Sequence, residues 1–261
     1  MGRMSGASAR DAAATAEDVQ AALGELASPE RAAGSARFFK TGPGEYGEGD
    51  VFIGVTVPAT RTVVARFADL PQPEVERLLA SGVHEHRLAG LLIMVRRFQV
   101  AGRARTRDDA VRHDLHVAYL DAVRSGHVDN WDLVDCSAEW LVGEVLVDAG
   151  RGDDPLLDRL AASASLWERR VAVLATFAFI KAGDAAPTLR LAARLLDDRE
   201  DLMHKAVGWM LREVGKRVGR AELIAFLDEY APRMPRTMLS YATEHLSPEE
   251  RLAYRAMRRV R

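Results

Sequence analysis

The chain has little of several features that define whole classes of protein. Its 261 residues include one cysteine, Cys136, so no intramolecular disulfide can form and no cysteine-based metal cluster is expected. The seven histidines are scattered without the spacing of metal ligands, and we expect neither a metal ion nor another cofactor. No run of about 20 uncharged apolar residues occurs, which predicts no membrane-spanning helix and no membrane partner. The first residues lack the apolar core of a signal peptide, so we expect a cytoplasmic protein.

Glycine and proline are also sparse, with 20 and 10 residues respectively. Alanine, leucine, arginine and glutamate dominate instead, and these residues favour helix. Apolar residues recur at helical spacing almost throughout, without a convincing β-hairpin or βαβ pattern. We therefore predict an all-α fold. The expected helices lie near residues 16–27, 58–69, 72–83, 85–103, 106–125, 131–149, 154–163, 166–182, 186–197, 201–217, 219–230, 235–246 and 248–260.

Two stretches interrupt the helical pattern in the first quarter of the chain. Residues 41–50 contain four glycines and a proline, which predicts a loop. Residues 51–55 are apolar enough for a strand, but with no second strand to pair with they are interpreted as a buried extended segment. Residues 1–14 are small and polar, and we expect them to be disordered. The remaining residues, 15–261, are expected to form one domain, since this length suits one extended repeat array.

The net charge is close to neutral, with 36 Lys and Arg against 38 Asp and Glu. This balance argues against a uniformly basic nucleic-acid binder. Binding to DNA, however, needs only a basic surface, so the distribution of the cations matters more than their sum.

Four cations share a position at the start of long apolar helices: Arg87, Arg170, Lys205 and Arg236. Arg170 and Lys205 are 35 residues apart and Lys205 and Arg236 are 31 apart, close to the length of one helix pair in an α-solenoid. The spacing predicts that the four cations form a stripe along the concave wall of a curved α-solenoid. Because helix N-termini favour anions, a phosphate backbone is the expected ligand.

The helix expected at residue 131 departs from that rule. Asn130 is a good N-cap, and Trp131 and Asp135, one turn apart, share one helix face. This helix therefore presents an indole and a carboxylate where the others present a cation. Trp209 lies four residues after Lys205, which places a second indole on a neighbouring helix.

These features together predict a groove in which Asp135 lies between Trp131 and Trp209. Arg170 and Lys205 would border this groove. From the pattern alone Trp209 could equally be a core residue, and Arg170 with its neighbour Arg169 could be a solvated pair.

Several motifs resemble those of the AlkD-like DNA glycosylases. The central ones are Asn-Trp-Asp-Leu-Val-Asp at 130–135, Leu-Trp-Glu-Arg-Arg-Val-Ala at 166–172 and Lys-Ala-Val-Gly-Trp-Met-Leu-Arg-Glu at 205–213. Ala-Arg-Phe-Phe-Lys at 36–40 and Phe-Ile-Gly-Val-x-x-Pro-x-x-Arg at 52–61 are also similar. The resemblance covers about residues 30–250 in consistent order.

The resemblance implies a curved α-α superhelix of HEAT-like helix pairs that grips double-stranded DNA containing alkylated bases. Members of the family excise cationic N3- and N7-alkylpurines without extruding the base. Trp131 and Trp209 would pack beside the damaged nucleotide, Asp135 would be the catalytic carboxylate, and Arg170 would contact the DNA backbone. Arg87, Lys205 and Arg236 are expected as further backbone contacts, from the repeat spacing. We expect a monomer that associates with the nucleoid when it binds DNA.

The residue types suit that chemistry. An alkylated purine is already cationic, so its glycosidic bond is weak and positive charge develops on the sugar as the bond breaks. A carboxylate stabilises that charge and can orient water, and indole faces favour a cation by about 0.5–2 kcal/mol each. No lysine has a partner that would make it a Schiff-base nucleophile, so a monofunctional glycosylase is expected.

Two alternatives remain open from the sequence. One is a self-resistance glycosylase specialised for bulky DNA adducts of natural products. The other is a non-catalytic HEAT-like scaffold that binds DNA or protein.

Overall fold

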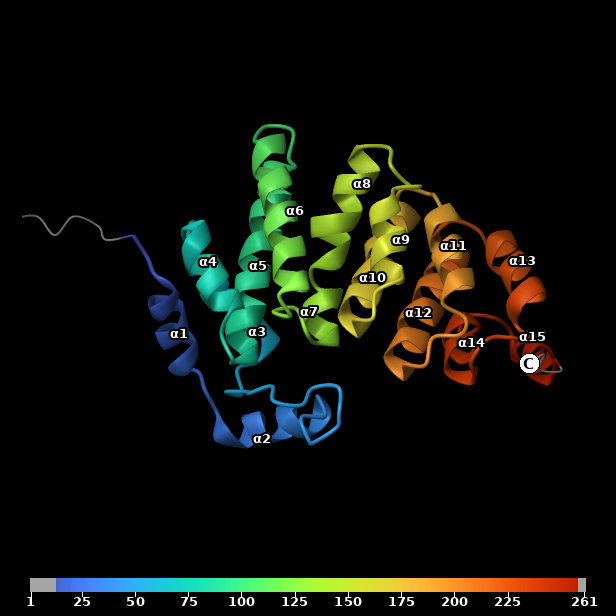
Figure 1. Ribbon diagram of the computed structural model, residues 1–261, viewed down its shortest axis with the longest axis horizontal. Coiled ribbons are helices and arrows are strands. Elements are labelled where there is room, and N and C mark those ends of the chain that lie inside the picture. Colours follow the sequence, from blue (N-terminus) through green and yellow to red (C-terminus); the bar gives the residue numbers. More distant parts are fainter. Residues whose placement is uncertain (1–12, 258–261) are drawn as a thin grey trace, which may run out of the picture. The chain divides into compact units, whose positions relative to one another are not determined.

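The computed structural model describes residues 13–257. Over this range the chain forms fifteen α-helices and one π-helix and no β-strand, which confirms the all-helical prediction (Figure 1). The only β-type pairing in the described range is an isolated parallel bridge between Val51 and Val83. No helix in the described range is both long enough and apolar enough to span a membrane.

The chain divides into two compact units, with the boundary between Met94 and Val95, inside helix α5 (His84–Ala101). The prediction of one domain over residues 15–261 stays a prediction. The predicted disorder at 1–14 falls mostly on residues 1–12, which lie outside the described residues.

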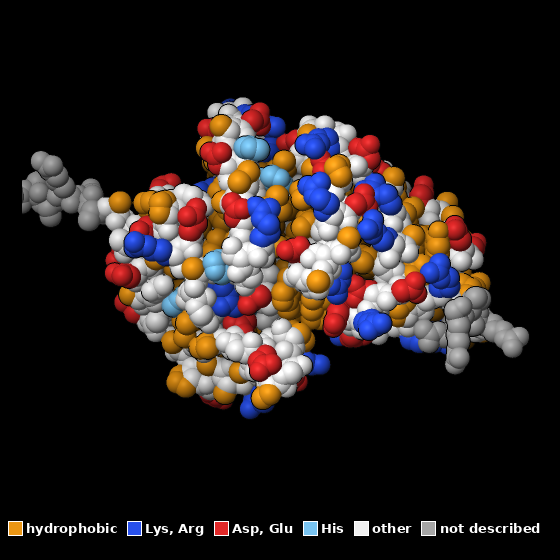
Figure 2. Space-filling model, viewed as in Figure 1, with side chains coloured by type: hydrophobic (Ala, Val, Ile, Leu, Met, Phe, Trp, Pro, Cys, Tyr) orange, Lys and Arg blue, Asp and Glu red, His pale blue; other side chains and the backbone are white. Residues whose placement is uncertain are grey.

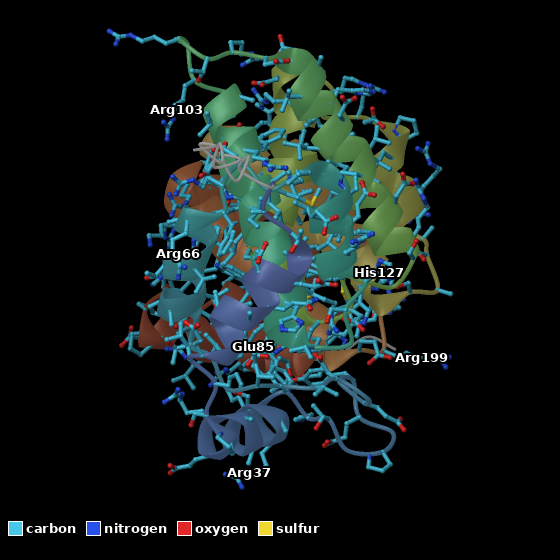
Figure 3. All side chains as sticks on the ribbon, turned by 90° about the vertical axis from the view of Figure 1, so that its left-hand side faces the viewer. Arg37, Arg66, Glu85, Arg103, His127 and Arg199 are labelled. Atoms are coloured by element: carbon cyan, nitrogen blue, oxygen red, sulfur yellow. The ribbon has the colours of Figure 1, made fainter. Side chains whose placement is uncertain are left out.

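The first unit contains four complete helices and the start of α5. They are α1 (Ala16–Gly24), α2 (Pro29–Phe38), α3 (Val57–Arg66) and α4 (Gln72–Leu79). Helix α1 packs against α3 and α4. Figure 3 shows Arg37 and Arg66 pointing away from this unit, whereas Glu85 is enclosed within it.

Helix α2 is a difference from the sequence-based prediction, which placed no helix there. Ser28 caps it by accepting a hydrogen bond from the Arg31 N–H, and Pro29 occupies its first position, where proline is well tolerated. None of its residues is buried. A helix that buries no apolar face leaves no apolar period in the sequence, which explains why the pattern did not predict it.

The segment after the glycine-rich loop is only partly buried, unlike the prediction: Gly54 and Val55 are buried, whereas Val51 is 53% exposed. Glu85 supplies the partner that a second strand would provide. Its carboxylate accepts hydrogen bonds from the N–H groups of Ile53, Gly54 and Val55 at 2.7–3.2 Å. Gly54 has φ +79°, and a Cβ there would lie 2.2 Å from the Ser28 carbonyl oxygen. The glycine is therefore required both by the backbone conformation and by the close approach.

The second unit begins within α5 and contains the remaining helices, which follow one another in chain order in Figure 1. These are α6 (Asp109–Arg124), α7 (Trp131–Asp135), the π-helix η1 (Glu139–Gly143), α8 (Glu144–Asp148), α9 (Pro155–Ala161), α10 (Leu166–Lys181), α11 (Ala186–Arg194), α12 (Asp201–Arg217), α13 (Arg220–Tyr230), α14 (Arg236–Ala242) and α15 (Pro248–Ala256). Helix α10 packs against α7, η1 and α12, and α12 packs in turn against α14.

A period of 35 residues relates four of these helices. Helices α7, α10, α12 and α14 begin at Trp131, Leu166, Asp201 and Arg236, each 35 residues after the previous start. This regular pairing supports a helical repeat, while the curvature of an α-solenoid stays a prediction.

The period also corrects the predicted stripe of cations. Asp135, Arg170 and Lys205 each occupy the fifth position of their helix, whereas Arg236 occupies the first position of α14. Arg236 is thus equivalent to Asp201 and not to Lys205.

The predicted continuous helix at 131–149 is wrong, because the structure breaks it after Asp135 and continues it as a π-helix. The Ser137 hydroxyl lies 2.6 Å from the Leu133 carbonyl oxygen, a bond that bends helices. A π-helix changes the backbone hydrogen-bonding pattern. Leu141 lies in this π-helix, and its carbonyl oxygen is 2.6 Å from the ring Nδ1 of His116. Gly143 packs so closely that a Cβ would lie 2.1 Å from the Ala175 carbonyl oxygen.

Candidate functional site

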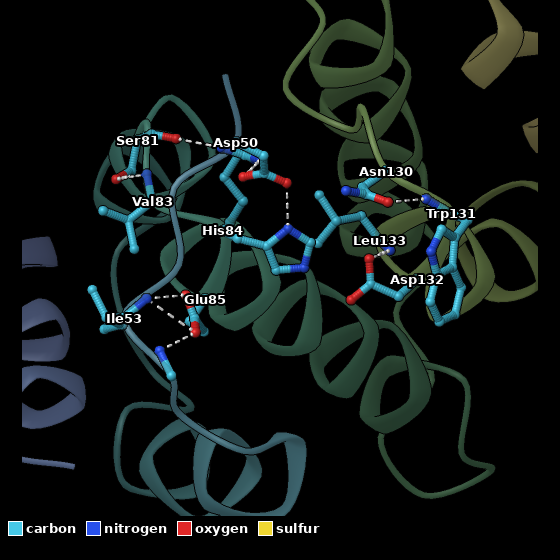
Figure 4. A network of polar contacts seen from close by, with 12 residues as sticks. Asp50, Ile53, Ser81, Val83, His84, Glu85, Asn130, Trp131, Asp132 and Leu133 are labelled. Carbon is cyan, nitrogen blue, oxygen red and sulfur yellow. Dashed lines mark hydrogen bonds and ion pairs between the residues drawn. The ribbon is translucent and has the colours of Figure 1, made fainter. Parts of the chain in front are cut away.

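Helix α7 orients its side chains by local capping. The Asn130 side chain accepts a hydrogen bond from the Trp131 N–H at 2.9 Å (Figure 4). Leu133 and Val134 are fully buried and anchor the helix. Trp131 and Asp135 are half-buried, so the single turn presents an indole and a carboxylate together at the surface.

Asp135 forms a two-point ion pair with Arg170 of the neighbouring helix α10. Arg170 Nε donates to Oδ1 and Nη2 donates to Oδ2, each at 2.9 Å. Arg170 Nη1 also donates to the Leu202 carbonyl oxygen of α12 at 2.7 Å. One guanidinium therefore links α7, α10 and α12, three of the helices related by the 35-residue period, and fixes the carboxylate plane.

The two members of the pair differ in burial. The Asp135 side chain is 18% exposed and that of Arg170 is 5% exposed. Burial raises the pKa of the Asp135 carboxyl above its usual value, and the charge and hydrogen bonds of Arg170 oppose that rise. Because both carboxylate oxygens accept N–H bonds from a cation, the geometry favours the ionised form. The site holds an ion pair whose carboxylate is partly exposed.

Beneath the carboxylate lies a buried polar contact that supports α7. Ser137 Oγ lies 3.0 Å from the Tyr119 hydroxyl, and Tyr119 is fully buried. Burial raises the pKa of the Tyr119 phenol, so it stays protonated. The Cys136 sulfur lies 3.3 Å from the Leu133 carbonyl oxygen, as expected for a thiol used in packing.

The predicted position of Trp209 beside Asp135 stays a prediction, and the structure gives one contact of its indole. Its indole is half-buried and contacts the Phe177 ring, with centroids 6.2 Å apart. Trp209 follows Leu202 by seven residues and Phe177 follows Arg170 by seven, so this contact lies about 10 Å along the helices from the Asp135–Arg170 pair. Trp131 lies one turn before Asp135 on α7, and Trp209 lies on α12.

Two of the predicted backbone contacts lie at the surface of the second unit. The Lys205 ammonium lies 2.8 Å from an Asp201 carboxylate oxygen, and its side chain is 41% exposed. Arg236 is exposed and donates to the Arg255 carbonyl oxygen at 2.8 Å. Both retain access to solvent and suit a contact with phosphate.

Arg87, the remaining predicted contact, belongs to the first unit and is 5% exposed. It donates to Asp50 Oδ1 at 2.7 Å and to the Ser81 carbonyl oxygen at 3.0 Å. Asp50 also lies 2.7 Å from His84 Nδ1 (Figure 4). A guanidinium enclosed in this way has little access to a phosphate, so burial argues against the predicted backbone contact of Arg87, which stays a prediction.

The sequence analysis did not predict the pairing of Asp135 with Arg170, although a signal was present. The two residues are 35 residues apart, the same interval as Arg170 and Lys205. Opposite charges at equivalent positions of adjacent helices predict an ion pair. Among residues 13–257, no group of three or more His, Cys, Asp or Glu side chains could hold a metal ion.

The fold and the site together define a class: a helical-repeat protein with a half-buried carboxylate, clamped by arginine, beside an indole. The family model for the DNA alkylation repair enzyme matches residues 19–246. The chain belongs to this family of DNA alkylation repair enzymes.

A solved structure supports the fold. It is described as a predicted DNA alkylation repair enzyme from Enterococcus faecalis and aligns with 85% of this chain and 98% of its own, with a TM-score of 0.67 and 16% identity. A comparison with curated proteins finds no match. The family assigns the chain to repair of alkylation damage in DNA.

Proposed function

We propose that the protein is a monofunctional DNA glycosylase that hydrolyses the N-glycosidic bond of cationic N3- and N7-alkylpurines in duplex DNA. The observation that carries this proposal is the Asp135 carboxylate, which is ionised, partly exposed and fixed by Arg170. A carboxylate held in this way suits stabilisation of a cation that forms during a reaction.

The chemistry needs no acid from the protein. The alkylated purine leaves as a neutral base and takes the electron pair of the glycosidic bond, so positive charge develops on the sugar. Asp135 stabilises this charge and orients a water molecule, whose oxygen bonds to the sugar carbon and whose proton is released. The products are the free base and an abasic site.

The aromatic residues have separate positions in this proposal. Trp131 shares the turn of Asp135, so its ring face can contact the cationic nucleotide beside the carboxylate. Trp209, whose indole contacts Phe177, is proposed as the second indole that packs beside the damaged nucleotide. Both indoles are half-buried at the helix surface, which suits a base that stays in the duplex better than one enclosed in a pocket.

The cations also divide by role. In the geometry of the structure Arg170 is a positioning residue, because its guanidinium acts on Asp135 and is 5% exposed. Lys205 and Arg236 are proposed as contacts to DNA phosphates. A direct phosphate contact by Arg170 stays a prediction.

The test is an excision assay on duplexes that carry 7-methylguanine or 3-methyladenine, comparing wild type with Asp135→Asn. We expect the variant to lose release of the base by on the order of 100-fold or more, while it still binds duplex DNA. Asp132→Asn is the matched control, because Asp132 lies in the same helix and accepts a hydrogen bond from the Leu133 N–H at 2.9 Å.

Thermal unfolding of both variants separates loss of chemistry from loss of fold. Excision by Asp135→Asn at the wild-type rate would reject the proposed role of the carboxylate. A wild-type protein that binds DNA and releases no base would favour the non-catalytic scaffold.

A further inference from the structure

A second cluster of charged and aromatic side chains crosses the helices that carry Asp135 and Arg170. The Phe177 ring of α10 receives two cations: Lys181 Nζ lies 4.9 Å and the Arg217 guanidinium carbon 5.2 Å from its centroid. Lys181 also lies 5.2 Å from the Trp140 ring centroid, and Trp209 packs against Phe177. Two like charges therefore converge on one ring, in the middle of a row of aromatic side chains.

The acidic side chains of this cluster are more deeply buried than the basic ones. Lys181 forms an ion pair with Glu139, and Arg217 pairs through Nε with Glu213 at 2.7 Å. The two carboxylate side chains are 12% and 5% exposed, whereas Lys181 is 37% and Arg217 is 42% exposed. The negative groups lie beneath and the positive groups lie outside, so an approaching ligand meets cations.

One carboxylate partner does not exhaust the donors of these cations. A lysine ammonium has three N–H donors and an arginine guanidinium has five. The ring faces favour both cations where they are and reduce the entropy lost when a ligand binds. This arrangement suits an oxyanion with several acceptor oxygens, such as a phosphodiester.

The spacing along the helices relates this cluster to the proposed glycosylase site. Lys181 follows Arg170 by eleven residues on α10, which is close to three whole turns, so the two residues share a helix face. The separation along the axis is about 16 Å. The major groove of B-DNA is about 12 Å wide, so Asp135 at one level and the two cations at the other can face the two strands that border it.

We propose that Lys181 and Arg217 form a phosphate clamp that binds the backbone of the DNA strand bordering the far side of the groove from Asp135. This proposal rests on the proposed function, because it takes duplex DNA as the ligand. The clamp recognises phosphodiesters and is indifferent to the lesion. Phe177 acts as a positioning residue that holds the two cations together.

The experiment measures binding of an undamaged duplex as a function of salt, for wild type, Lys181→Gln/Arg217→Gln and Phe177→Leu. Arg194→Gln is the matched control. Arg194 lies on α11, and its side chain is 48% exposed, similar to that of Arg217. It pairs with Asp158, whose side chain is 35% exposed, so this pair lacks the buried carboxylate of the cluster. In Figure 1, α9 and α11 lie in front of α10 and α12, and Figure 2 shows basic and acidic side chains interspersed over this face.

We expect the double variant to bind on the order of tenfold more weakly. Its slope of log K against log salt should be smaller in magnitude by about 2, one for each phosphate that the clamp no longer binds. Phe177→Leu should weaken binding less, because both charges remain. Arg194→Gln should match wild type.

The results separate this proposal from the proposed function. If wild type binds duplex and releases no alkylated base, the glycosylase proposal fails while the clamp is still decided by the salt slopes. A double variant with the wild-type affinity and slope would overturn the clamp, and so would a wild type that does not bind duplex. Equal losses in the double variant and Arg194→Gln would also overturn it, because the effect would then be one of net charge.

Discussion

Each unit of the protein contains an aspartate paired with a buried arginine, and the two pairs differ in the exposure of the aspartate. In the first unit the side chains of Asp50 and Arg87 are 4% and 6% exposed. In the second unit Arg170 is equally buried, at 5%, but Asp135 is 18% exposed. The Asp50–Arg87 pair is closed on both sides, whereas the Asp135–Arg170 pair leaves its carboxylate open.

The partners of the two carboxylates explain the difference. Asp50 is held by Arg87 and lies 2.7 Å from His84, whose ring stacks on Phe52 with centroids 4.4 Å apart. Asp135 lies at the end of a helix of one turn, before the break at 136–137. The same pair of residue types is therefore enclosed in the first unit and leaves a partly exposed carboxylate in the second.

Removal of the closed carboxylate should have the largest effect on stability. Asp50→Asn leaves Arg87 with its charge buried and should lower the free energy of unfolding by about 3–5 kcal/mol. Urea denaturation measures this loss. Below the unfolding transition the excision rate should stay near that of wild type. A variant as stable as wild type would contradict the structural role given to the Asp50–Arg87 pair.

Removal of the cation from the open pair should change chemistry as well as stability. Arg170→Gln should cost about 1–3 kcal/mol, less than Asp50→Asn, because water can still reach Asp135. Since Arg170 opposes the effect of burial, its loss raises the pKa of Asp135 further. In the proposed mechanism excision depends on the ionised form, so the acid limb of the pH–rate profile should move to higher pH.

Single-turnover excision measured as a function of pH, for wild type and Arg170→Gln, would measure that shift. An unchanged acid limb would show that Arg170 does not act on the reaction through Asp135.

A third substitution tests the carboxylate that binds backbone in the first unit. Glu85→Gln keeps one acceptor oxygen but loses the charge that serves the N–H groups of Ile53, Gly54 and Val55. We expect a loss of about 1–2 kcal/mol and faster amide hydrogen exchange at these three residues. Exchange at α7, in the second unit, should not change and provides the internal control.

The smallest effect should come from the histidine beside the π-helix. Burial lowers the pKa of His116 below its ordinary 6.5, so the neutral ring is favoured in the folded state. Its contribution to stability is complete above pH 6.5 and is lost as the pH falls below that value, where the unfolded chain takes up the proton. The melting temperature should therefore decline on acidification.

His86 contributes in the same direction, because burial lowers its pKa as well. The specific test is thus the difference between wild type and His116→Gln, which should lose part of the decline. Identical pH profiles would exclude a role for His116.

The sequence predicted those helices that bury an apolar face. The helices of the second unit begin close to their predicted residues, and α10 and α12 begin at the predicted position. Helix α2 could not be predicted in this way because it buries no residue. The apolar pattern does not predict the break after Asp135, because the apolar spacing continues through it. The break is accompanied by a hydrogen bond from the Ser137 hydroxyl to the Leu133 carbonyl oxygen.

The candidate site divides in the same way. Asn130, Trp131 and Asp135 follow from local rules of capping and helical spacing, and the structure keeps them together. The contact of Trp209 with Phe177 depends on how α10 and α12 are aligned against each other. A periodic pattern shows which face of a helix a residue lies on, but it does not show which residue of the neighbouring helix lies opposite.

The sequence by itself determined that the chain is helical, that its helices repeat, and that Trp131 and Asp135 share a turn, because these properties depend on residues close together in the chain. Only the tertiary structure decided that Arg87 is enclosed with Asp50 while Asp135 stays partly open beside Arg170. Exposure is set by every segment that packs around a side chain, and those segments come from distant parts of the sequence. Two aspartate–arginine pairs alike in residue type therefore differ in what they can bind.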